Sequence, residues 1–103
     1  MPTYDLTLTF AQTMAAEEAQ NLRNAMVDFV RPALVLDESA EIEIISPKEF
    51  AIHITTTEEL SEFDQSGLVA TLVEAIDQGM GSDLAVPFRV TGWEQQDAVG
   101  FRR

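Results

Sequence analysis

The sequence has 103 residues and a formal net charge of −12, with 18 acidic against six basic side chains and no cysteine. This length fits one domain, because single hydrophobic cores commonly close at about 100–150 residues. The charge argues against binding to nucleic-acid phosphates or anionic membranes, and the lack of cysteine excludes disulfides and cysteine nucleophiles. No apolar run reaches the about 20 residues of a membrane span, and no leader precedes Tyr4, so we expect a cytoplasmic protein.

The first predicted element is a strand over residues 4–10. Its side chains alternate between apolar and polar, which is typical of a strand with one buried face. The apolar positions are Tyr4, Leu6, Leu8 and Phe10. A helix follows, with Thr13 as its expected N-cap and its end near Val30 or Arg31, because Pro32 disfavours helical backbone before it.

Two further strands are predicted over residues 41–45 and 50–55. The segment between them, Ser46-Pro47-Lys48-Glu49, has proline at the second position, as type I turns often do. A tight turn between two alternating runs indicates a hairpin, so these strands should be antiparallel neighbours. Asp37 and Glu38 precede the first of them and are expected in a turn.

A second helix is expected after the hairpin. Thr56 and Glu59 have the spacing of a capping box, which would begin it. Gly67 weakens the helical pattern and suggests a break there, whereas Gly79 or Gly81 supplies the left-handed stop. The inward stripe consists of Leu68, Val69, Leu72, Val73, Ile76 and Met80.

The last predicted strand spans residues 84–93. Pro87 cannot donate to a strand ladder, so this strand should lie at a sheet edge. The order β-α-β-β-α-β is that of the ferredoxin-like α+β sandwich, in which two helices cover one face of a four-stranded antiparallel sheet. The first and third strands are then central and the other face is open. We expect one α/β domain over residues 1–94 and a tail over residues 95–103.

The open face provides the candidate binding residues. They are Asp5, Thr7, His53, Arg89 and Trp93. His53 is the sole histidine; one hypothesis makes it a general base or metal ligand, with Arg89 as an anion clamp and Asp5 as its orienter. The alternative is a half-exposed strand residue that pairs with a neighbouring threonine or acid.

Trp93 has two interpretations, as an anchor for a partner or as a lid folded over the open sheet. We expect no cofactor and no metal, because the acidic residues lack the pattern of a calcium loop. Those residues are Asp37, Glu38, Glu41 and Glu43.

The favoured function is that of a non-catalytic acidic interaction domain. An open face with several apolar residues needs partial cover, and a homodimer formed through that face or through an edge strand is the commonest way to provide it. The apolar residues are Ile45, Ala51, Ala85, Pro87 and Trp93. One alternative is an inhibitor or nucleic-acid mimic that binds a basic protein. Another is a small-molecule-binding or enzymatic domain that uses His53 and Arg89, and a third attributes the acidity to adaptation to high salt.

Overall fold

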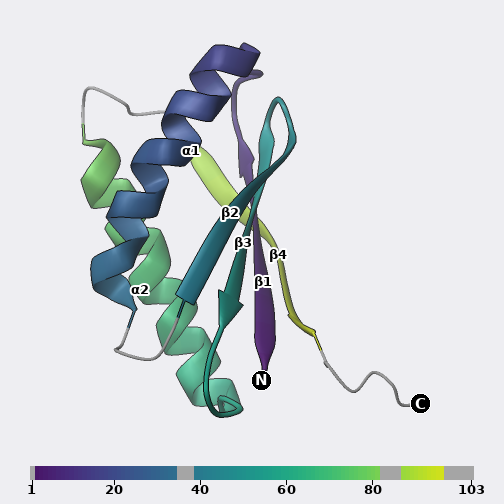
Figure 1. Cartoon of the computed structure of the whole chain (residues 1–103), viewed down its shortest axis with the longest axis vertical. Helices are drawn as coiled ribbons and strands as arrows, with labels where there is room; N and C mark the ends of the chain where they lie inside the picture. The colour runs from purple at the N-terminus through teal and green to yellow at the C-terminus, as the bar shows by residue number, and fades with distance from the viewer. Residues whose placement is uncertain (1, 35–38, 82–86, 97–103) are drawn as a thin grey trace.

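The computed structural model describes residues 2–34, 39–81 and 87–96. The elements follow the predicted order (Figure 1). They are β1 (Thr3–Phe10), α1 (Ala16–Val30), the 3-10 turn η1 (Arg31–Ala33), β2 (Ser39–Ser46), β3 (Glu49–Thr55), α2 (Glu62–Met80) and β4 (Phe88–Gln96). The sheet order is β2-β3-β1-β4, and every neighbouring pair is antiparallel. The chain therefore has a ferredoxin-like α+β fold, with β1 and β3 central as predicted.

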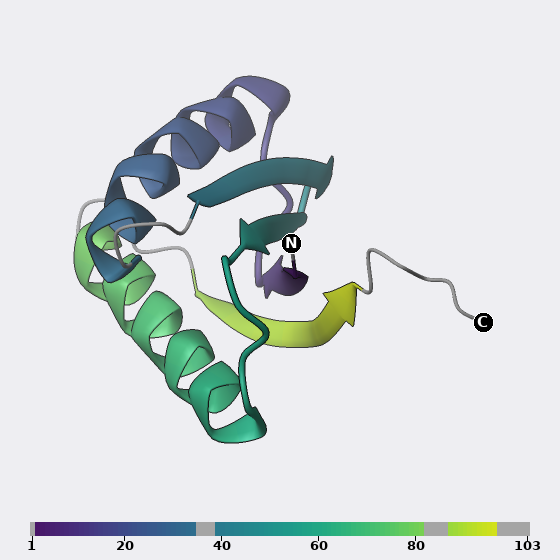
Figure 2. The same cartoon turned by 60° about the horizontal axis from the view of Figure 1, so that its bottom comes forward.

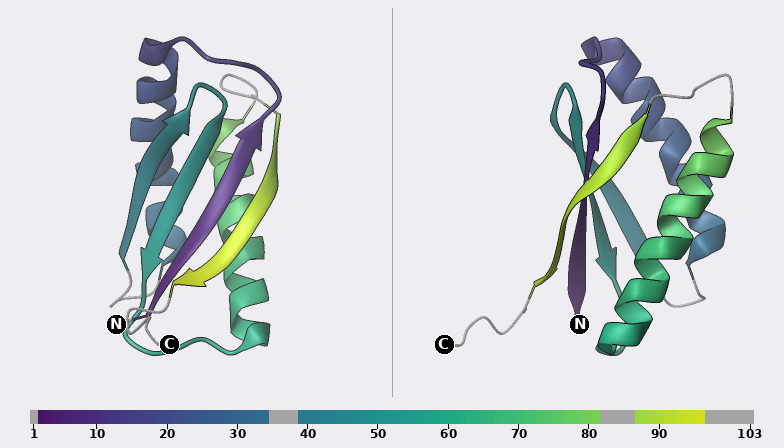
Figure 3. Two further views of the ribbon diagram at one scale, coloured as in Figure 1. Left: turned by 90° about the vertical axis from the view of Figure 1, so that its right-hand side faces the viewer. Right: turned by 180° about the vertical axis from the view of Figure 1, so that it is seen from behind.

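Both helices cover the same face of the sheet. Figure 2 shows the two helices on one side and the four strands on the other. In Figure 3, α1 lies behind β2, and α2 lies on the side of β4. No helix of the described residues lies on the opposite face of the sheet, so we consider that face and the two edge strands as surfaces for a partner.

Alternation along the central strands sorts the side chains as predicted. The apolar positions of β1 and β3 are fully buried under the helices, whereas the positions between them are mostly half-buried. Ile52 is 0% exposed, and its neighbour His53 lies on the other face. Residues from α1 and α2 complete this core, which includes Leu22, Met26, Leu72, Ile76 and Met80.

Both helices begin later than predicted. Helix α1 has Ala15 rather than Thr13 as its N-cap, and the Glu18 carboxylate accepts the Ala15 N–H at 3.1 Å. Helix α2 begins at Glu62, and its N-cap is Ser61, whose hydroxyl accepts the Asp64 N–H at 3.1 Å. The predicted capping box at Thr56 is wrong, because the buried Thr56 hydroxyl donates instead to the Glu58 carbonyl at 2.7 Å.

The glycines of α2 also differ from expectation. Gly67 does not break the helix, which runs continuously through it. Gly81 ends the helix with φ at +53°, and its N–H bonds to the Asp77 carbonyl, which confirms the predicted left-handed stop. Gly79 has another role: a Cβ there would lie 2.4 Å from the Phe29 ring. The missing side chain lets α1 and α2 approach closely.

Strand β4 contains a bulge that alters which side chains face the helices. Thr7 lies opposite Gly92 and Leu8 lies opposite Val90, so Thr91 is an extra residue in β4. A bulge shifts the alternation by one residue. A Cβ at Gly92 would lie 3.3 Å from the Thr7 Cβ, which is close for any side chain.

The ends of β4 depart from the predicted limits. The strand begins at Phe88 and continues to Gln96, so Gln95 and Gln96, which we expected in the tail, belong to the sheet. Residues 84–86 of the predicted strand, the turn at residues 37–38 and the remaining tail residues 97–103 lie outside the described residues.

Candidate functional site

A row of charged side chains crosses the open face of the sheet. Glu41 of β2 lies opposite His53 of β3, which lies opposite Asp5 of β1, which in turn lies opposite Glu94 of β4. Glu43 of β2 reaches the same histidine from the next row. The open face is therefore acidic at its centre.

His53 is held between two carboxylates. Its Nδ1 lies 2.6 Å from Asp5 Oδ1, and its Nε2 lies 2.8 Å from Glu43 Oε1. A neutral imidazole has one N–H, so both contacts are hydrogen bonds only when the ring is protonated. The hydrogen bond to Asp5 and then that to Glu43 raise the pKa of His53 above its ordinary value, while partial burial opposes them. When it is protonated, His53 therefore joins a carboxylate of β1 to a carboxylate of β2.

Arg89 does not lie beside His53, so the hypothesised site with His53 as general base and Arg89 as anion clamp is not assembled. Arg89 lies opposite Thr9, four residues along β1 from Asp5, which is a separation of about 13 Å at strand spacing. Both ring nitrogens of His53 also face carboxylates, so neither is free to take a proton from a substrate. Thr7 lies one row from Asp5, between Ala51 and Gly92. Of the five candidate residues, the structure brings only Asp5 and His53 into contact within the described residues.

Trp93 lies on the helix-covered face, so its predicted position on the open face is wrong. Its ring stacks on Tyr4 with 5.5 Å between centroids, and its Nε1–H donates to Gln65 Oε1 on α2 at 2.9 Å. The bulge at Thr91 is the physical cause, because it places Trp93 opposite the buried Leu6. A glycine inside a strand pattern, here Gly92, was the sequence signal that could have indicated the bulge.

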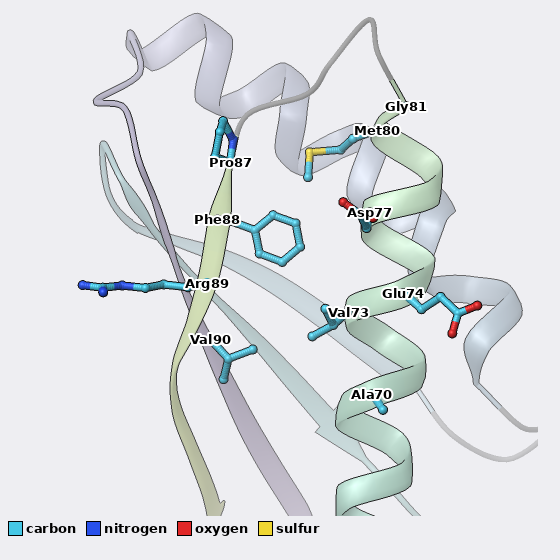
Figure 4. Close-up of a pocket in the computed structure, with 10 residues that line it drawn as sticks. All are labelled: Ala70, Val73, Glu74, Asp77, Met80, Gly81, Pro87, Phe88, Arg89 and Val90. Carbon is cyan, nitrogen blue, oxygen red and sulfur yellow. The ribbon is translucent and has the colours of Figure 1, made fainter.

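An apolar groove between α2 and β4 was not predicted from the sequence. It has a volume of about 720 Å³, and Figure 4 shows Phe88 and Val90 pointing from β4 toward α2, while Arg89 points to the other side. Its apolar walls are formed by Ala70, Val73, Met80, Phe88 and Val90. A second hollow of about 520 Å³, lined by Val69, Ala70 and Trp93 among others, continues along α2.

The two edge strands differ in character. The outer strand β2 presents Glu41 and Glu43, and a register shift at Ile45 leaves that side chain 52% exposed. Strand β4 presents Val90, which is 39% exposed, beside the apolar groove. Both edges carry charged side chains and one irregularity, but opposed charges of one sign disfavour pairing with a second copy, whereas charges of both signs can pair. Edge β4, which carries Arg89 and Glu94 beside the apolar groove, is therefore the better candidate for an interface.

Comparisons with known proteins show the extent of similarity. No protein-family model matches the sequence, and no curated protein matches it. One similar solved structure is an amidase of the hydantoinase/carbamoylase family from Burkholderia multivorans, 12% identical with a TM-score of 0.44 over 93% of this chain and 27% of that one. Another is AtUAH in complex with glyoxylate, which is 14% identical. Its TM-score is 0.39, over 95% of this chain and 29% of that one. This chain spans less than a third of either protein.

Two searches of the described residues gave negative results. No three histidine, aspartate or glutamate side chains converge to hold a metal ion there. No helix in the same part of the chain is long and apolar enough to cross a membrane.

Proposed function

We propose that this chain is a non-catalytic protein-interaction domain that self-associates as a homodimer through its β4 edge. The observation that carries the proposal is the exposed Val90 on an edge strand beside an apolar groove. An edge strand leaves a row of backbone N–H and C=O groups on its outer side, which a second strand can satisfy. We also propose the cytoplasmic location expected from the sequence.

The open sheet face is the weaker candidate for self-association. Its centre holds Glu41, Glu43, Asp5 and Glu94, with His53 among them. Two such faces would bring like charges together across a shared surface, which costs free energy. At the β4 edge, the exposed Val90 and the outer backbone groups would meet, together with one cation and one anion, Arg89 and Glu94.

Net charge sets the salt dependence of such a dimer. Each copy carries −12, so two copies repel one another at long range. Added salt screens this repulsion over a Debye length of about 8 Å at physiological ionic strength, whereas apolar contacts and backbone hydrogen bonds at the interface are screened little. The homodimer is therefore expected to tighten as salt is added.

The acidic row favours a second candidate function, namely docking onto a basic protein. Its carboxylates lie on the face of the sheet opposite α1 and α2 (Figure 3 shows the two layers) and would meet cationic side chains there. Association of this kind weakens with salt, because screening reduces attraction between opposite charges. The sign of the salt dependence thus separates the two candidates.

The test is sedimentation velocity of the full chain at tens of micromolar protein, a range in which interfaces of about micromolar Kd are populated. We expect a dimer that tightens between about 0.02 M and about 0.3 M salt. Val90→Lys should weaken it at least about tenfold, because it buries a charge at the interface. Ile45→Lys is the matched control on the other edge and should leave it unchanged. A monomer at every salt concentration, or equal effects of both variants, would overturn the proposal.

A further inference from the structure

We infer that the two β4 strands of the dimer pair antiparallel in one register, with Arg89 of each copy opposite Glu94 of the other. This inference rests on the proposed function and adds to it the geometry of the contact. The register places Val90 opposite Trp93 of the second copy and centres the two-fold axis on the bulge. The side-chain faces and backbone directions of β4 permit this register, and the charges of the strand select it.

The first feature is the distribution of side chains between the two faces. Before the bulge, Phe88 and Val90 face the helices and Arg89 faces the open side; after it, Trp93 faces the helices and Glu94 the open side. Residues opposite one another in an antiparallel pair share a face. A register that pairs the segment before the bulge with the segment after it therefore keeps every opposed pair on one face.

The second feature is the direction of the backbone groups. Val90 and Trp93 lie opposite Leu8 and Leu6, which are two residues apart on β1. Residues two apart on a strand direct their N–H and C=O groups to the same side. Val90 and Trp93 therefore share one orientation, as residues that oppose one another across an antiparallel ladder must. In this register the bulge of each copy therefore interrupts neither the matching of side-chain faces nor the hydrogen-bond ladder between the two β4 strands.

The third feature is charge. The described residues of β4 carry one cation, Arg89, and one anion, Glu94, both on the open side of the strand. The register that pairs them forms two Arg–Glu contacts related by the two-fold axis. It also pairs the strand over Phe88 to Gln95, nearly its full length. A shift of two residues would place Arg89 opposite Gly92 and shorten the ladder.

The test uses charge reversal and mixing, read by sedimentation velocity. Arg89→Glu alone places two Glu–Glu contacts across the axis, and Glu94→Arg alone places two Arg–Arg contacts. We expect each variant to weaken the homodimer at least about tenfold, because opposed like charges are unfavourable. An equimolar mixture of the two variants should form a heterodimer, and the double variant Arg89→Glu/Glu94→Arg should recover the homodimer, because both restore opposite charges.

Two controls account for net charge and folding. Arg31→Glu and Glu58→Arg make the same changes in net charge at exposed positions away from β4 and should leave the homodimer within about twofold of the wild type. Circular dichroism melting confirms that each variant is folded.

The outcomes distinguish the inference from the proposed function. Suppose that the wild type dimerises and Val90→Lys disrupts the dimer, but that neither the mixture nor the double variant recovers it. The inferred register is then wrong, while the proposed interface at the β4 edge is retained. If the wild type is a monomer, the proposed function fails and the register fails with it. Recovery in the mixture is the result that supports the inferred register.

Discussion

Trp93 stacks face to face on Tyr4, with 5.5 Å between the ring centroids and 7° between the ring planes. Five positions separate Trp93 from Phe88, an odd number that strict alternation would place on opposite faces. Both nevertheless pack against the helix side of the sheet. The extra residue Thr91 reconciles these facts, and it joins the end of β4 to the core through an aromatic pair.

This stacking predicts a large loss of stability in Trp93→Ala. The substitution removes the contact with Tyr4 and the hydrogen bond to Gln65, and truncation of a packed aromatic costs about 3–5 kcal/mol when fully buried, with a smaller loss at this partly exposed site. Urea unfolding measures the free energy. Phe63→Ala is the control, because Phe63 is 86% exposed and its truncation should change stability by less than about 0.5 kcal/mol. Equal losses in both variants would contradict the position of Trp93.

His53 predicts a dependence of stability on pH. Its folded pKa is raised, chiefly by the hydrogen bond to Asp5 and next by that to Glu43. The stabilisation is therefore fully present below the unfolded pKa of about 6.5 and is lost as pH rises through the folded value. Unfolding free energies measured from about pH 6 upward should fall for the wild type.

The matched variant for this pH dependence is His53→Gln. Glutamine retains hydrogen-bonding capacity without a proton that titrates in this range. The fall in unfolding free energy between the unfolded and folded pKa values of His53 should therefore be absent in this variant. Since His53 is the sole histidine of the chain, no other imidazole contributes to the difference. A wild type that gains stability as pH rises over this window would show that the imidazolium is not held as described.

The two glycines within α2 predict opposite effects of alanine. At Gly67 an added Cβ meets nothing within 4 Å, so Gly67→Ala should stabilise the protein by about 0.5–1 kcal/mol through helix propensity. At Gly79 the Cβ would lie 2.4 Å from the Phe29 ring, and overpacking of this kind costs about 1–3 kcal/mol. Thermal unfolding of both variants measures the difference in stability. Adding Phe29→Leu to Gly79→Ala should relieve the overpacking. Stabilisation by both alanines would contradict the close approach of α1 and α2.

Strand alternation and chain order were sufficient to predict the order and pairing of the strands. The apolar positions of residues 4–10 and 50–55 face the core because period-two patterns with one buried face permit a single register. The order of elements then limited the topology to the observed one, and the placement of His53 on the open face beside Asp5 followed from it. The helix stop at Gly81 was predictable because few residues other than glycine adopt positive φ readily.

The features missed by sequence reasoning depend on one inserted residue or on tertiary packing. The bulge at Thr91 shifted Trp93 to the other face, and a strict period of two contains no signal for an insertion. The predicted helix starts were wrong because Thr13 and Thr56 have good capping chemistry, whereas the N-caps in the folded chain are Ala15 and Ser61. The α2–β4 groove arises from the spacing of two elements far apart in sequence, which no local pattern encodes.

Hydrogen exchange of the backbone amides as a function of protein concentration tests the β4 interface most directly. Amides on the outer side of β4 should gain protection as concentration rises through the dimer Kd, while the outer amides of β2 should exchange at an unchanged rate. This pattern would identify β4 as the strand that pairs between copies. Exchange in β4 that does not respond to concentration in a sample shown to be dimeric would place the interface elsewhere and contradict self-association through this edge.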